Sequence, residues 1–199
     1  PPPPPPPFSS RRRHTRSYLK SRGLGDVYKR QTRGSDISVS IGDYFSTMLD
    51  QSMNWSDAEA LREKWGGPFC LKGIMSVSDA RKAVDIGADA IMVSNPGGRQ
   101  LDGSRSPFDQ IAEISDAVGD KIDVILDGGV RRGTHVLKAI AAGAKACSGG
   151  RMYLYALAAA GQPGVERTLQ NLKTEIERDM KLLGVTRISQ LNRDMLRYR

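Results

Sequence analysis

Histidine and cysteine are scarce in this chain of 199 residues, which contains two of each. His14 lies near the amino terminus and His135 lies inside an expected helix, where we predict a surface or packing role, so nucleophilic hydrolysis based on histidine is poorly supported. Cys70 and Cys147 are far apart and supply no cluster of zinc ligands. Because both cysteines lie in apolar, strand-like runs, we predict buried free thiols in a reducing compartment.

Long apolar runs are absent as well. No stretch approaches the ~18 consecutive apolar residues of a membrane-spanning helix. The amino terminus also lacks the apolar segment of a secretory signal. We therefore expect a soluble, cytoplasmic protein without a membrane span.

The formal charge of +8 is confined to one end of the chain. Residues 1–34 contain nine Lys or Arg and one acidic residue, whereas residues 35–199 contain 21 residues of each sign. Electrostatic binding of nucleic acid requires a basic surface. The neutral remainder therefore predicts that the folded part has no nucleic-acid partner.

Residues 1–31 form an unusual leader. A run of prolines, Pro1–Pro7, is followed by an arginine-rich stretch without hydrophobic periodicity. Such a composition cannot bury enough apolar surface to fold, so we expect disorder. A polyproline and arginine arm could bind an SH3-type domain or RNA. The leader also resembles translated adapter sequence, and we interpret it as non-native, which leaves 32–199 as the domain.

Downstream of an irregular loop over 32–53, hydrophobic periodicity predicts helices and strands in alternation. We expect Ser56 or Asp57 to cap the first helix and Thr134 to cap the fourth. The predicted helices are 55–65, 76–87, 108–118, 134–142, 153–160 and 165–183, and the predicted strands are 69–71, 90–93, 122–126 and 144–148. This order indicates a parallel sheet, either a barrel or a doubly wound sheet.

The polar motifs all follow strands. This placement is typical of the C-terminal face of a (β/α)₈ barrel, of which four strands would make one half. After the second strand, the loop Ser94–Asp102 contains Arg99, a residue suited to binding a carboxylate or a phosphate, and Gly97 and Gly98, which allow close approach of a ligand. Lys72 ends the first strand, where it is either a stabilising cation or a solvated surface residue.

Two glycine-rich loops follow the third and fourth strands, and each contains an arginine. The first is Asp127-Gly128-Gly129 with Arg131, and the second is Gly149-Gly150-Arg151. Loops of this kind either form tight turns or bind phosphate through backbone N–H groups and a helix N-terminus. Two in succession favour a phosphate site.

Together these motifs resemble the FMN-dependent α-hydroxy acid dehydrogenases and oxidases, and most of all the bacterial L-lactate dehydrogenases of that family. The resemblance covers about 35–199. The motifs that carry it are Leu71-Lys72-Gly73-Ile74, Ser94-Asn95-x-Gly97-Gly98-Arg99-Gln100-Leu101-Asp102, Leu126-Asp127-Gly128-Gly129-Val130-Arg131-Arg132-Gly133 and Gly150-Arg151. It implies an α/β fold, a TIM (β/α)₈ barrel whose C-terminal half this chain holds, and FMN as cofactor.

The resemblance also implies roles for individual residues in oxidising an L-2-hydroxy acid, such as L-lactate, to the 2-oxo acid. Arg99 would bind the substrate carboxylate, and Lys72 would contact the N1/O2 edge of the flavin. The other implied cofactor-binding residues are Ser94, Asp127, Gly128, Gly129, Arg131, Gly150 and Arg151. The family further implies a homotetramer and, in some members, association with the inner face of the membrane.

Position 96 departs from the family pattern. The family has a histidine there, which removes the proton of the substrate hydroxyl, whereas this chain has Pro96. Proline has no titratable group, so it cannot act as a base. With the first half of the barrel also missing, we expect the isolated chain to be inactive and poorly soluble. The alternative is a non-catalytic module that binds FMN, phosphate or sister subunits.

Overall fold

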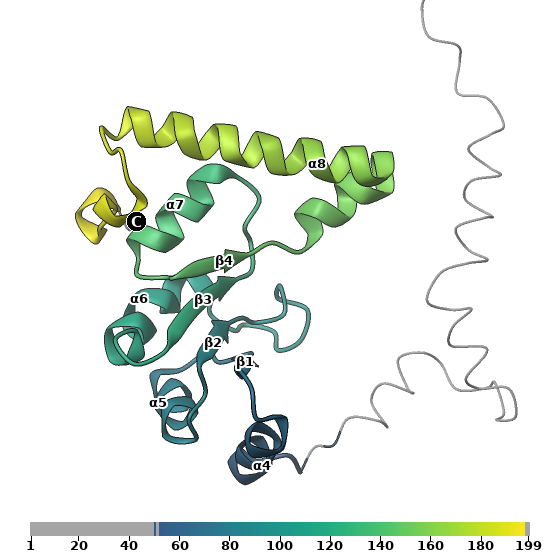
Figure 1. Cartoon of the computed structure of the whole chain (residues 1–199), viewed down its shortest axis with the longest axis vertical. Coiled ribbons are helices and arrows are strands. Elements are labelled where there is room, and N and C mark those ends of the chain that lie inside the picture. Colours follow the sequence, from purple (N-terminus) through teal and green to yellow (C-terminus); the bar gives the residue numbers. More distant parts are fainter. Residues whose placement is uncertain (1–49, 51, 198–199) are drawn as a thin grey trace, which may run out of the picture. The chain divides into compact units, whose positions relative to one another are not determined.

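Four parallel strands form one sheet in the order β1-β2-β3-β4, in a computed structural model that describes Asp50 and residues 52–197 (Figure 1). The strands are β1 (Cys70–Lys72), β2 (Ala90–Val93), β3 (Asp123–Asp127) and β4 (Ala146–Ser148). All neighbours pair in parallel, which confirms the predicted topology. The predicted leader, 1–31, lies outside the described residues.

Helices connect the strands, as predicted. They are α4 (Trp55–Trp65), α5 (Val77–Asp85), α6 (Pro107–Val118), α7 (Gly133–Ala141) and α8 (Arg151–Leu182), followed by short 3₁₀ helices at Ile188–Gln190 and Arg193–Met195. Figure 1 shows α5, α6 and α7 on one side of the sheet. Helix α8 is interrupted at Ala160 and Gly161, whose backbones are not helical, so the two predicted helices are present as parts of one segment.

The core lies between the sheet and helices α5, α6 and α7. Strands β2 and β3 direct alternate residues toward these helices, as expected for strands. The most completely buried of these strand residues are Ile91, Val93, Val124 and Leu126. Short helices are marginal alone, so this burial stabilises both layers at once.

The opposite face of the sheet is less covered by the described residues. The strand register aligns Lys72, Met92, Ile125 and Ala146 across the four strands. Lys72 and Ala146 are exposed, and Met92 and Ile125 are half-buried. In an eight-stranded barrel such residues form interior layers.

Three local predictions are wrong, each for a physical reason. Asn54, not Ser56 or Asp57, caps α4, because its side chain accepts the Ser56 N–H. Thr134 does not cap α7, which begins at Gly133. Cys70 is exposed because it belongs to the edge strand β1, while Cys147 is half-buried.

Both thiols are poorly ionised. Although Cys70 is exposed as a residue, partial burial of its thiol is the main cause of a raised pKa. Burial raises the pKa of Cys147 to about 11. A thiolate is the reactive form of cysteine, so neither residue is suited to nucleophilic chemistry at neutral pH.

Candidate active site

A polar cluster joins the C-terminal ends of β1, β2 and β3. The Lys72 ammonium donates to Ser94 Oγ at 2.8 Å and also pairs with the Asp127 carboxylate. Ser94 is buried, and its hydroxyl donates to Asp127 Oδ2 at 2.6 Å. The structure therefore brings together three residues that the sequence analysis placed in one site.

The charge of Asp127 is stabilised within this cluster. Burial raises the pKa of Asp127, but hydrogen bonds from Lys72, Ser94 and Ser148 outweigh that effect, and the net pKa lies below its ordinary value. An anionic Asp127 beside a cationic Lys72 gives a fixed dipole at the C-terminal edge of the sheet. Such preorganised charge is what a polar ligand or a transition state can use.

Replacing this aspartate should make stability less dependent on pH. The folded-state pKa of Asp127 is lowered, so its contribution is present above the unfolded pKa of ~3.9 and is lost as the pH falls through the folded-state value. We expect Asp127→Asn to lower the free energy of unfolding by about 1 kcal/mol at pH 7. Urea denaturation at pH 7 and at pH 3 should show the difference from the unaltered chain shrinking at pH 3.

The matched control is Asp120→Asn, at an exposed aspartate in the turn after α6. A surface substitution of this kind changes stability by less than about 0.5 kcal/mol. If Asp127→Asn lowers the free energy of unfolding equally at both pH values, the electrostatic role of Asp127 is contradicted.

Beside the polar cluster lies a pocket of about 540 Å³, at the ends of β3 and β4. Its size falls within the range of ligand sites. The residues that the sequence singled out contribute a large part of the lining, namely Pro96, Gly97, Arg99, Asp127, Gly128, Gly129, Arg131, Gly150 and Arg151. The two glycine-rich loops thus meet the Ser94–Asp102 loop at one cavity.

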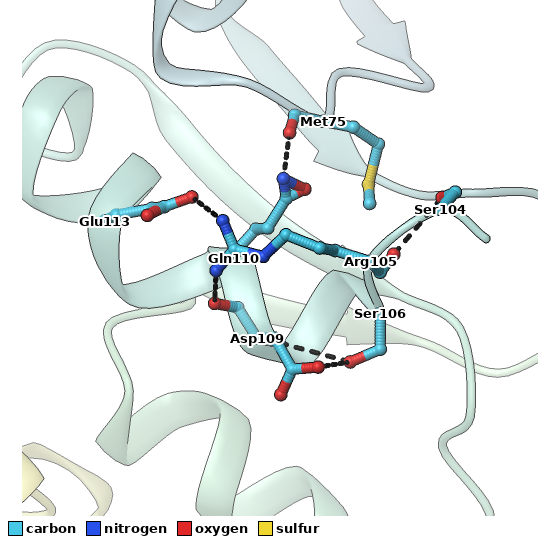
Figure 2. Close-up of polar contacts among 7 residues, drawn as sticks. All are labelled: Met75, Ser104, Arg105, Ser106, Asp109, Gln110 and Glu113. Carbon is cyan, nitrogen blue, oxygen red and sulfur yellow. Dashed lines mark hydrogen bonds and ion pairs between the residues drawn. The ribbon is translucent and has the colours of Figure 1, made fainter.

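Hydrogen bonds of the Asn95 side chain restrain the Ser94–Asp102 loop. Asn95 Oδ1 accepts the Gly98 N–H at 3.1 Å, and Asn95 Nδ2 donates to the Arg105 carbonyl at 3.3 Å. The Arg105 guanidinium in turn donates to Glu113 Oε1 at 2.9 Å and to the Asp109 carbonyl at 2.7 Å (Figure 2). The segment from Asn95 to Arg105 is therefore closed at its base, while Arg99 within it is exposed.

Figure 2 also shows a hydrogen bond that joins α6 to the loop after β1. The Gln110 side chain, which is buried in α6, donates to the Met75 carbonyl in the loop after β1. Arg105 and Gln110 were not predicted as site residues. The sequence offered only a weak signal for them, since both lie near Ser106, the N-cap of α6.

Pro96 adopts a backbone conformation that proline disfavours. Its φ is +29°. The pyrrolidine ring holds φ near −65°, so this residue is strained. The loop geometry at position 96 is one that a residue without the ring accommodates more readily.

Two residues outside the predicted site stabilise the glycine-rich loop after β3, in roles that the sequence did not predict. The Arg131 N–H donates to His135 Nδ1 at 3.2 Å. Glu175 of α8 accepts the Gly133 N–H at 2.8 Å and pairs with Arg132 at 2.8 Å. His135 therefore has a structural role in this loop, and Glu175 caps α7 in place of Thr134.

Two kinds of feature are absent from the described residues. Within residues 50 and 52–197, no group of three His, Cys, Asp or Glu side chains is arranged to hold a metal ion. No helix in the described part of the chain has the length and hydropathy needed to cross a membrane.

The chain is similar to several known proteins. The family model described as FMN-dependent dehydrogenase matches residues 7–198. An L-lactate dehydrogenase of Alcaligenes faecalis is 47% identical over 173 residues, which are 87% of this chain and 45% of that protein. A pre-mycofactocin synthase of Mycobacterium tuberculosis is 44% identical over 164 residues, 82% of this chain and 41% of that protein.

Solved structures show the same similarity. The flavin-binding domain of baker's yeast flavocytochrome b2 matches with a TM-score of 0.71 at 45% identity, over 74% of this chain and 39% of that one. A mandelate oxidase with benzoyl-formic acid matches with a TM-score of 0.68 at 46% identity, over 71% and 42% of the two chains. The chain thus spans less than half the length of these relatives.

Proposed function

The chain belongs to the FMN-dependent dehydrogenase family, whose members are TIM-barrel oxidoreductases, and we propose from this premise that it contributes the FMN-phosphate site and the substrate-carboxylate site of an α-hydroxy acid dehydrogenase or oxidase. We further propose an L-2-hydroxy acid as substrate, L-lactate before others. The observation that carries the proposal is that Arg99, Asp127, Arg131 and Arg151 line the same pocket of about 540 Å³.

The residues present fit the phosphate of FMN. A Cβ added at Gly129 or Gly150 would meet no atom within 4 Å, so both glycines leave open space beside their backbones. Arg131 and Arg151 are exposed in the same pocket, and Gly150 is the N-cap of α8. Backbone N–H groups at a helix N-terminus together with arginine form a favourable site for a phosphate.

The remaining residues fit the substrate and the ring. A planar guanidinium such as that of Arg99 binds a carboxylate through two hydrogen bonds, and Arg99 makes no salt bridge among the described residues. Lys72 provides a cation that Asp127 and Ser94 hold in place. When bound, FMN would accept the two electrons that leave the substrate as its hydroxyl carbon becomes a carbonyl.

A second candidate function follows from Pro96. The reaction requires a base for the hydroxyl proton, and proline offers none. The chain as it stands then fits a module that binds FMN or phosphate without turnover. Adding L-lactate to the chain with FMN distinguishes the two, because bleaching of the flavin absorbance indicates turnover, whereas flavin that is bound but not bleached indicates the module.

Titration with FMN and with riboflavin tests the phosphate site. Riboflavin lacks the phosphate, so we expect FMN to bind more tightly, as measured by quenching of flavin fluorescence. Replacing Arg131 by Gln removes a charge-assisted hydrogen bond and should weaken FMN binding about tenfold. Riboflavin binding should be unchanged.

The matched control is Arg81→Gln, an exposed arginine in α5 outside the pocket. It should leave the affinity for both flavins unaltered. Equal affinities for FMN and riboflavin in the unaltered chain would overturn the proposed phosphate site.

A further inference from the structure

One hydrogen bond connects the two halves of the proposed site. Arg151 Nη2, at the start of α8, donates to the Gly97 carbonyl of the Ser94–Asp102 loop at 3.0 Å. The two residues are 54 positions apart in the sequence. The arginine proposed for the phosphate therefore also holds the loop that bears Arg99.

The packing at Gly97 matches this contact. A Cβ added at Gly97 would lie 2.6 Å from Arg151 Nη2, too close for any real contact. The neighbouring Gly98 has nearly the same backbone, with φ of +72° against +70° at Gly97, yet its Cβ would meet nothing within 4 Å. The guanidinium thus occupies the space that a side chain at position 97 would need.

The contact with Gly97 leaves other N–H donors of the Arg151 guanidinium available to a ligand. A guanidinium carries five N–H donors in a rigid plane, and the bond to Gly97 uses one Nη2 hydrogen. The Nε and Nη1 donors belong to the same rigid group, so an anion bound to them restrains Nη2 as well. Arg151 lines the same pocket as Gly129 and Arg131, where we place the phosphate.

We infer that Arg151 is a positioning residue that couples the phosphate site to the substrate loop. It holds the loop through the Gly97 carbonyl, and a phosphate on its other donors tightens that hold, which keeps Arg99 over the pocket. The contact with the loop exists without a ligand. The effect of phosphate rests on the proposed function.

Trypsin offers a direct test, because it cleaves after Arg99 and a restrained loop is cut more slowly. The rate of cleavage between Arg99 and Gln100 is measured by mass spectrometry for the full chain. Without flavin, we expect Gly97→Ala to be cleaved about three- to tenfold faster than Gly98→Ala, since only the former displaces the charged hydrogen-bond donor. The strain from positive φ is the same in both variants.

The second arm adds FMN, or riboflavin as the probe without phosphate. FMN should slow the cleavage after Arg99 by about threefold or more in the unaltered chain and in Gly98→Ala, by stabilising the closed loop. Riboflavin should not. In Gly97→Ala and Arg151→Gln the protection by FMN should be absent.

The outcomes separate the coupling from the proposed function. Equal cleavage of Gly97→Ala and Gly98→Ala without flavin would overturn the inference. Equal protection of these two variants from trypsin by bound FMN would also overturn the inference. If the unaltered chain does not quench the fluorescence of FMN, the proposed function is overturned. The comparison of cleavage rates without flavin would still decide whether Arg151 holds the loop.

Discussion

Replacing Gly133 by alanine is expected to destabilise the fold by about 3 kcal/mol, at the upper end for overpacking of a core. An added Cβ would lie 2.6 Å from Glu175 Cβ, 2.6 Å from the Ile176 nitrogen and 2.8 Å from the Leu172 carbonyl oxygen. Two of these atoms are backbone, so α8 would have to move away from α7 as a whole. The same displacement would break the bond from the Gly133 N–H to Glu175, at 2.8 Å.

Urea denaturation followed by circular dichroism measures this effect. For a chain of this size, a loss of about 3 kcal/mol corresponds to a melting temperature lower by roughly 6–12 °C. Gly150→Ala is the control, because a Cβ there would meet nothing within 4 Å. A loss in Gly133→Ala no greater than in Gly150→Ala would show that α8 is not packed on α7 as described (Figure 1).

Replacing Pro96 by histidine is expected to raise turnover of L-lactate by about 10²–10⁴-fold, the usual contribution of a general base. The measurement requires a complete barrel, so the first half of an L-lactate dehydrogenase relative is joined to residues 50–199. Flavin reduction by L-lactate is then followed by stopped-flow absorbance. The rise follows from the proposed function, in which position 96 faces the same pocket as Arg99.

Pro96→Gly separates the base from the backbone strain in the same chimera. Glycine accepts the φ of +29° that strains proline. It should therefore raise the free energy of unfolding by about 1–3 kcal/mol without restoring turnover. If glycine restores turnover as well as histidine does, the strained loop and not the missing base is the defect.

Local patterns were sufficient to predict the order of the elements. The strand Ala90–Val93 was predicted with its exact bounds, and the parallel pairing of the strands followed from the alternation of helices and strands. The sequential order β1-β2-β3-β4 is that of the barrel, which the family resemblance implied. Alternation requires crossover connections, and these favour parallel pairing of neighbouring strands. The C-terminal ends of such strands lie at one edge of the sheet, and the family resemblance assigned Lys72 and Asp127 to one cofactor site there.

Contacts between distant residues were beyond the reach of the sequence. Thr134 had the right residue type for a cap, yet Glu175, 42 positions from Gly133, caps α7. The cap depends on how α8 lies over α7, which no local pattern encodes. Cys70 also looked like a core residue, but its strand lies at the edge of the sheet.

The loop Ser94–Asp102 also has properties that its sequence determined and others that depend on the tertiary structure. Its sequence determined the family resemblance, the carboxylate-binding role implied for Arg99 and the absence of a base at Pro96. Only the tertiary structure decided that Pro96 is strained, that Asn95 ties the loop to Arg105, and that Arg151 reaches Gly97. Residue type sets what a side chain can do chemically, whereas the packing of separate βα units sets which groups are close enough to act together.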